Sequence, residues 1–149
     1  MPLSDLILTD AIPPGAEATI GNGLNVYNDE LVGYADRRPL AVLIQDPATS
    51  AILGGAIGRT SLGLLFLDLF HLPASLRGAG LGSRILRMFE HEGRRRGCRT
   101  AVLYTISFQA PGFYERHGWR RFGEIPCDPP GTSRIFMTKT LSPPTEPSA

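Results

Sequence analysis

A glycine-rich turn that leads directly into a helix is the feature that most constrains this chain. The turn reads Arg77-Gly-Ala-Gly-Leu-Gly82, and the segment after it carries apolar residues at helical spacing. Glycine adopts left-handed backbone conformations at little cost and leaves no side chain between the amide groups and a ligand. Because free amides at a helix N-terminus attract anions, the turn suits a pyrophosphate. A glycine-rich turn can also serve only to begin a helix, so glycine content alone leaves both interpretations open.

Two common phosphate-binding loops do not fit this turn. A Walker A loop needs a lysine after its last glycine, and Lys139 is the only lysine in the sequence. A Rossmann fingerprint spaces its glycines as Gly-x-Gly-x-x-Gly, whereas Gly78, Gly80 and Gly82 are spaced as Gly-x-Gly-x-Gly. The strand before the turn also belongs to predicted hairpins rather than to a first βαβ unit. Both nucleotide-fold interpretations therefore fail.

Composition limits the remaining classes of protein. The chain has 149 residues, of which 42% are hydrophobic, and this is enough to bury the core of one domain. A formal net charge of +1 argues against a dedicated nucleic-acid-binding protein. Cys98 and Cys127 are too few and too far apart for a disulfide framework or a zinc site. The sequence shows neither a signal peptide nor an apolar run that could span a membrane. We therefore expect a cytoplasmic protein without nucleic-acid or membrane partners.

Periodicity and turn residues predict a mixture of strands and helices. Short helical segments are expected at residues 17–20 and 25–32, and a strongly amphipathic helix should run from Leu81 to the arginines before Gly97. Another short helix is expected at 109–116. The expected strands cover residues 6–8, 39–45, 51–58, 64–72, 99–106, 119–123 and 133–141. The proline-rich tail, residues 142–149, is expected to be disordered, which leaves residues 1–141 as the domain.

Two motifs at matching spacing resemble those of the GNAT superfamily of N-acetyltransferases. The family signature, Arg/Gln-x-x-Gly-x-Gly/Ala, is met by Arg77–Gly82. The second motif, Ala-x-x-Phe-Tyr-x-x-x-Gly-Phe, is matched by residues 110–119, with Trp119 where phenylalanine is usual. The order of the predicted elements also fits, so the resemblance covers about residues 3–141. It implies an α/β (α+β) fold with a mixed, mostly antiparallel sheet of six or seven strands. Helices should cover both faces, and the family's fourth and fifth strands should splay apart.

The resemblance implies an enzyme that moves an acetyl group from acetyl-CoA directly to a primary amine and needs no metal. Near-neutral charge argues weakly against a histone-type acceptor, so a small-molecule amine is expected. The same fold could instead serve as a non-catalytic acyl-CoA-binding or sensory module, or it could acetylate protein amines. Exposed edge strands in this fold also make a homodimer an option.

The resemblance further implies which residues bind acetyl-CoA. The amides of Gly78–Ser83 should hold the pyrophosphate, and backbone groups of Phe70 and Leu72 should meet the pantetheine. The Phe70 N–H should polarise the thioester carbonyl. Arg94–Arg96 could reach the 3′-phosphate or form a solvated helix end. The expected cofactor-binding residues are Phe70, His71, Leu72, Arg77, Gly78, Ala79, Gly80, Leu81, Gly82, Ser83 and Ser107, the last standing where many members have asparagine.

Two side chains are candidates for proton transfer. Tyr114 occupies the tyrosine of the second motif, which in the family protonates the thiolate leaving group. Strand alternation places Asp68 on the same face as Phe66 and Phe70, where it can act as the base that accepts the amine proton. Asp68 can equally be a structural acceptor. Histidine is a residue type that often serves as a base near neutral pH, but alternation places His71 on the opposite face.

The acceptor-binding residues are the least constrained by the sequence. Asn25 and Tyr27 lie in the early helical region that lines the acceptor pocket in this family, although solvated loop residues would look the same. Tyr104 faces either the core or the acceptor. His91 and His117 stand among charged residues, which is typical of a surface position.

Overall fold

The computed structural model describes residues 4–141, so the predicted disordered tail, 142–149, lies outside the described residues. The chain divides into two compact units, residues 1–35 and 36–149, and each is described by itself.

The first unit contains one helix, α1 (Ala16–Val32), where two short helical segments were predicted. Gly15 and Gly33 flank it in left-handed conformations, and the Gly33 N–H closes the last turn on the Asp29 carbonyl at 2.8 Å. Gly21 and Gly23 lower the helix propensity by about 1 kcal/mol each without ending the helix. The strand predicted at residues 6–8 is wrong, because these residues have no regular structure. Among residues 4–35 there is no strand with which they could pair.

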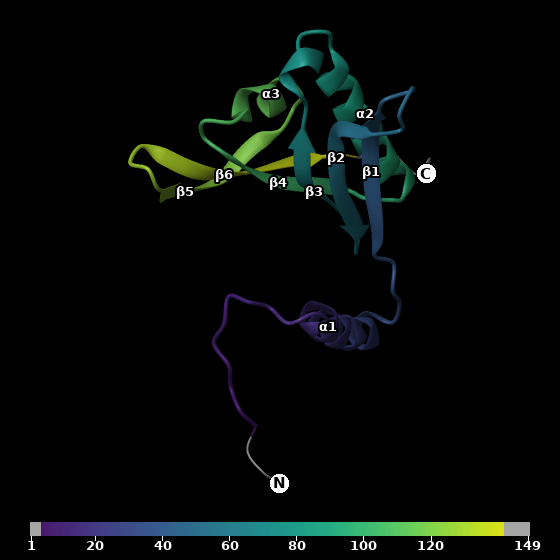
Figure 1. The fold of residues 1–149 in the computed structure, drawn as a ribbon. Coiled ribbons are helices and arrows are strands. Elements are labelled where there is room, and N and C mark those ends of the chain that lie inside the picture. Colours follow the sequence, from purple (N-terminus) through teal and green to yellow (C-terminus); the bar gives the residue numbers. More distant parts are fainter. Residues whose placement is uncertain (1–3, 142–149) are drawn as a thin grey trace. The chain divides into compact units, whose positions relative to one another are not determined.

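The second unit is built on a six-stranded sheet in the order β1-β2-β3-β4-β6-β5 (Figure 1). The β3–β4 pair is parallel and the other neighbours are antiparallel, which confirms the predicted mixed, mostly antiparallel fold class. The strands are β1 (Arg38–Gln45), β2 (Ile52–Ser61), β3 (Leu64–His71), β4 (Thr100–Ile106), β5 (Arg120–Cys127) and β6 (Thr132–Thr140). The helices are α2 (Leu81–Arg95) and α3 (Pro111–Arg116), preceded by a 3₁₀ turn at Ala74–Leu76. β5 extends past its predicted end because it pairs with β6 as far as Cys127 and Thr132.

The core lies between the sheet and α2. Ile85, Leu86 and Phe89 of α2 are buried against strand residues that include Leu65 and Leu67. Met88 of the same helix lies outside this core and is 55% exposed. We call the side of the sheet that packs on α2 the helix face, and the opposite side the outer face.

A bulge changes which side chains of β3 point to the helix face. Leu67 lies opposite Gly58, and Leu69 lies opposite Ile57, so Asp68 has no partner on β2. Phe70 then lies opposite the buried Ala56 and joins the helix face. The prediction that Asp68 and Phe70 share a face is therefore wrong, since simple alternation fails at a bulge.

β3 and β4 are the strands expected at residues 64–72 and 99–106, which correspond to the family's fourth and fifth strands, and they splay apart as expected. The two strands pair from Leu64–Phe66 to Thr100–Val102, and the pairing ends there. The remaining residues of both strands, 67–71 and 103–106, diverge without a shared ladder. This divergence opens the sheet where the candidate site lies.

Candidate functional site

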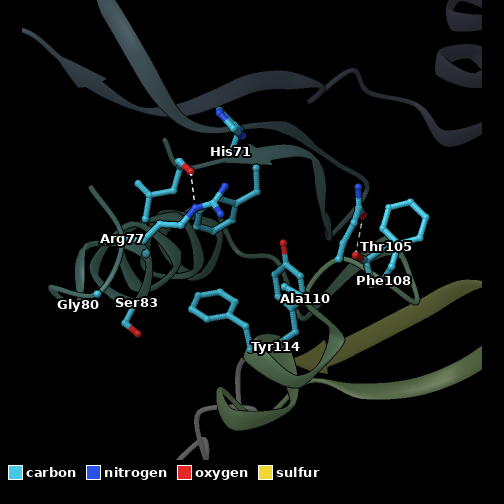
Figure 2. Close-up of a pocket in the computed structure, with 14 residues that line it drawn as sticks. His71, Arg77, Gly80, Ser83, Thr105, Phe108, Ala110 and Tyr114 are labelled. Atoms are coloured by element: carbon cyan, nitrogen blue, oxygen red, sulfur yellow. Dashed lines mark hydrogen bonds between the residues drawn. The ribbon is translucent and has the colours of Figure 1, made fainter. Parts of the chain in front are cut away.

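A cavity of about 630 Å³ lies on the helix face at the splayed ends of β3 and β4 (Figure 2). The glycine turn and the start of α2 close one side, and α3 with the loop before it closes the other. The lining residues are Phe70, His71, Leu72, Arg77, Gly78, Gly80, Gly82, Ser83, Thr105, Phe108, Gln109, Ala110, Phe113 and Tyr114. Both sequence motifs therefore contribute to one cavity.

The glycine turn has the backbone geometry that glycine permits. Gly78 and Gly80 adopt left-handed conformations, with φ of +91° and +79°, and a Cβ added at either would meet no atom within 4 Å. The Arg77 side chain braces the turn, because its Nε donates to the Leu72 carbonyl at 2.8 Å. The space above the turn is thus kept open for a ligand.

The amides of this turn are unused in the described part of the chain. The Arg84 N–H donates to the Gly80 carbonyl at 3.1 Å, but no hydrogen bond is made by the N–H groups of residues 78–83. The first turn of α2 contains no acidic residue that would compete with an anion. These donors fit a pyrophosphate in number and in charge.

His117 joins α3 to the start of α2, although the sequence suggested a surface position. Its Nε2 is 2.8 Å from the Ser83 Oγ, and its ring lies against Phe113 with 4.9 Å between centroids. His117 is therefore partly buried rather than fully solvated, because the tertiary fold brings α3 onto α2. His91 is exposed, as expected.

A buried ionic network beneath α2 holds the end of α3 in place. Glu90 is only 3% exposed and accepts from Trp119 Nε1 at 3.0 Å and from Lys139 Nζ at 2.7 Å. Lys139 also donates to the His117 carbonyl at 2.7 Å. The only lysine of the sequence thus ties β6 to α2 and α3. Sequence reasoning missed both Glu90 and Lys139.

The arginines at the other end of α2 make structural contacts. Arg94 donates to the Leu141 carbonyl, and Arg96 reaches Thr60 and the Pro39 carbonyl. Hydrogen bonds from Arg95 and Arg96 lower the pKa of Glu92 to about 2. These residues lie at the opposite end of a 15-residue helix from the glycine turn. This distance favours the helix-end interpretation over contact with a 3′-phosphate.

Tyr114 is buried at the centre of an aromatic group. Its ring packs edge-on against Phe70, Phe113 and Trp119, with centroid distances of 6.4, 5.3 and 5.9 Å. Burial raises the pKa of Tyr114 to about 12, so the phenol stays protonated near neutral pH. Its hydroxyl has no hydrogen-bond partner in the part of the chain that the structure describes. Figure 2 shows this hydroxyl directed into the cavity.

A second cavity, of about 220 Å³, lies in the gap between the splayed strands. Phe70, Thr105, Gln109 and Tyr114 line both cavities, so the two spaces meet at these residues. The other lining residues are Leu67, Asp68, Leu69, Leu103, Tyr104, Ile106 and Arg134. We call this space the outer cavity because Asp68, Tyr104 and Arg134 reach it from the outer face.

Asp68 lines the outer cavity from β3, and Tyr104 lines it from β4. Both Asp68 carboxylate oxygens accept from Arg59 Nη1 at 2.8 Å, and the Arg59 guanidinium lies 4.0 Å from the centre of the Phe66 ring. Asp68 is therefore ion-paired with Arg59. Tyr104 is 59% exposed, so of its two predicted environments the core is excluded.

Several expected residues lie elsewhere. Ser107 is outside the lining of both cavities, and its Oγ accepts from the Ser133 N–H at 3.0 Å. The side chains of Ala79 and Leu81 are likewise absent from the lining. Asn25 and Tyr27 belong to α1, in the first unit. The structure therefore brings together most of the predicted cofactor residues but not Ser107.

Three residues in or beside the β4–α3 loop were missed. Thr105, Phe108 and Gln109 line the first cavity, and Gln109 Oε1 accepts from the Thr105 hydroxyl and the Ile106 N–H, both at 2.9 Å. Their one sequence signal was their position just before the second motif.

Among residues 4–141, no group of three or more His, Cys, Asp or Glu side chains is arranged to hold a metal ion. Within the same range, no helix is both long and apolar enough to cross a membrane.

Comparison with known proteins agrees with the sequence motifs. Residues 16–119 match the model of the Acetyltransferase (GNAT) family. The chain is 33% identical over 135 residues to Acetyltransferase Atu2258 of Agrobacterium fabrum, covering 91% of this chain and 98% of that protein. It is 41% identical over 91 residues to Blasticidin-S acetyltransferase of Streptomyces morookaense, covering 60% and 67% of the two chains. A crystal structure of a protein from Agrobacterium tumefaciens superposes with a TM-score of 0.84 at 31% identity, covering 92% and 99%.

Proposed function

The chain belongs to the Acetyltransferase (GNAT) family, and on this premise we propose that it transfers an acetyl group from acetyl-CoA directly to a primary amine of a small molecule. One observation carries the proposal: the cavity on the helix face and the outer cavity between the splayed strands share Phe70, Thr105, Gln109 and Tyr114 as lining residues. A thioester that enters from the helix face and an amine that enters from the outer face can react beside these shared residues.

The first cavity, on the helix face, suits acetyl-CoA, which when bound supplies the acetyl group as a thioester. The unused amides of residues 78–83 would hold the pyrophosphate. The edge of β3 beyond Phe66, which has no ladder to β4, would hydrogen-bond the pantetheine arm. The Phe70 N–H would stabilise the oxyanion that develops on the acetyl carbonyl, and loss of such a donor costs about 3 kcal/mol.

Tyr114 would supply a proton to the thiolate leaving group. Its phenol stays protonated near neutral pH, and its hydroxyl is free to donate into the cavity. The aromatic packing fixes the direction of the ring. A positioned acid of this kind lowers the barrier to expulsion of the thiolate.

Asp68 is the base that we propose for the amine. An ammonium ion has no lone pair, so a proton must leave before nitrogen attacks. Asp68 and Phe70 both line the outer cavity, so an amine held there would lie near the proposed base and near the strand that would carry the oxyanion donor. Proton transfer can be direct or through one water molecule.

A small-molecule acceptor is supported by two observations. The outer cavity has a volume of only about 220 Å³. The relative from Streptomyces morookaense is, by its name, an acetyltransferase for blasticidin S.

The test is thiol release from acetyl-CoA over a panel of small amines and short peptides, together with direct calorimetry of acetyl-CoA binding. Thiol release that depends on a small amine supports the proposal. Binding without release from any amine would instead indicate a non-catalytic acyl-CoA-binding module. Release with peptide amines alone would indicate a protein-amine acetyltransferase, and failure to bind acetyl-CoA would contradict the assigned donor.

A further inference from the structure

The outer cavity contains a guanidinium that no carboxylate in residues 4–141 neutralises. Arg134 lines the cavity from β6, opposite Ile106 of β4, and it makes no ion pair and no side-chain hydrogen bond within that range. Within residues 4–141, the one described interaction of its side chain is with the Tyr104 ring, whose centre lies 5.9 Å from the guanidinium carbon. Arg59, by contrast, is already paired with Asp68.

We propose that Arg134 binds a carboxylate on the acceptor, so that the preferred substrates are amines that also carry a carboxylate. This inference rests on the proposed acetyl transfer and names the substrate class of the outer cavity. A guanidinium presents parallel N–H donors that match the two oxygens of a carboxylate. Because Arg134 has no partner that a substrate must first displace, its donors are available to bind one.

The charges around the outer cavity are complementary to such a molecule. Asp68 reaches the cavity from β3, and Arg134 reaches it from β6, beyond β4. An acceptor with an ammonium group and a carboxylate can place the first toward Asp68 and the second toward Arg134. This orientation brings the amine to the β3 side, where Phe70 and Tyr114 line the junction between the two cavities.

Tyr104 supports the same arrangement. Its ring packs against Phe136, with 5.7 Å between centroids, and against the Arg134 guanidinium. Stacking on an aromatic ring limits the rotamers of the guanidinium and reduces the entropy lost on binding.

The experiment compares each carboxylate-bearing amine with its neutral carboxamide. Suitable pairs are β-alanine and β-alaninamide, 4-aminobutyrate and its amide, and an α-amino acid and its amide. Thiol release gives kcat/KM for wild type, Arg134→Gln, Arg134→Lys and the matched control Arg120→Gln. Arg120 is an exposed β5 residue that lines neither of the two cavities.

For wild type, we expect the carboxylate member of the best pair to react with a kcat/KM about tenfold higher than its amide, as one charge-assisted contact provides. Arg134→Gln should abolish this preference, so that the ratio of the kcat/KM values for the carboxylate and its amide falls to about one. Arg134→Lys should retain part of the preference, and Arg120→Gln should retain all of it.

The outcomes separate the two proposals. Equal rates for carboxylates and amides in wild type would overturn the role of Arg134 and leave acetyl transfer standing. A preference for carboxylates that survives in a folded Arg134→Gln protein would likewise overturn the role of Arg134 and leave acetyl transfer standing. If acetyl-CoA binds but no amine in any pair releases thiol, the acetyl-transfer proposal fails, and the inference about Arg134 fails with it.

Discussion

The two halves of the β3–β4 pair differ in what they do, although each strand is continuous. Over Leu64–Phe66 and Thr100–Val102 the strands form a parallel ladder, and Leu65 and Ala101 are fully buried. Beyond that point the strands separate, and Phe70 and Thr105 line both cavities. The paired half contributes to the core, whereas the splayed half leaves backbone groups free for a ligand.

The difference shows how a sheet can open without losing its order. Unpaired backbone groups in a buried place are costly, so a splay persists only where neighbouring structure holds it. Here the bulge at Asp68 redirects Phe70, and the aromatic residues of α3 pack against it. Lys139, which is paired with Glu90, also donates to the carbonyl of His117 and so holds the C-terminal end of α3 in place.

Replacing Lys139 tests the paired half and has the largest expected effect on stability. Lys139 lies opposite Ala101 of that half and neutralises the buried Glu90. In Lys139→Met the Glu90 carboxylate loses its closest cation, and we expect a loss of about 3 kcal/mol in the free energy of unfolding, the low end for a buried pair because Lys139 is partly exposed. Urea denaturation measures this loss.

A double variant separates the buried charge from the lost packing. Glu90→Gln with Lys139→Met removes both charges and keeps an acceptor for Trp119. It should be more stable than Lys139→Met alone. A double variant that is less stable would show that the ionic pair is not the origin of the effect.

Replacing Tyr114 tests the splayed half. Tyr114→Phe keeps the ring and removes the hydroxyl, so we expect kcat to fall about 100-fold while acetyl-CoA affinity changes little. Stopped-flow thiol release and calorimetry measure the two quantities. Unchanged turnover would remove Tyr114 from the mechanism.

The raised pKa of Tyr114 also predicts how the stability of the wild type depends on pH, with Tyr114→Phe as the reference. Folding raises the pKa of Tyr114 from 10.0 to about 12, so the unfolded chain ionises first as pH rises. The stability of wild type should therefore fall between pH 10 and about 12, relative to Tyr114→Phe, and the two should respond alike below that window. Denaturation curves at pH 8 and pH 11 compare them.

Replacing Gly58 tests the boundary between the halves and has the smallest expected effect. A Cβ at Gly58 would collide with the Phe66 carbonyl and would lie 2.9 Å from the Phe89 ring. We expect Gly58→Ala to lose about 2 kcal/mol of unfolding free energy and to lower turnover, because the bulge that directs Phe70 must shift. A control is Gly23→Ala in α1, where a Cβ meets nothing within 4 Å and should stabilise the helix by up to about 1 kcal/mol. Full stability in Gly58→Ala would show that the bulge does not depend on this glycine.

The sequence was most informative where a requirement is local. The glycine turn needs a left-handed backbone at Gly78 and Gly80, which glycine provides. The residues after the turn show the apolar period of about 3.6 residues that an amphipathic helix needs. These features predicted the turn, the helix and the family. The second motif likewise marked Tyr114, whose burial and free hydroxyl the structure then showed.

Other features were decided only by the tertiary structure. The bulge at Asp68 reverses the face of Phe70, and a partner strand is needed to see it. The pairs Asp68–Arg59 and Glu90–Lys139 join residues 9 and 49 positions apart, and no spacing rule connects them. Residues 6–8 have the apolar pattern of a strand but no partner in their unit. Sequence by itself determined what depends on backbone conformation and period, because these act over a few residues. Faces, ion pairs and cavity walls depend on which distant segments meet, and only the folded chain decides that.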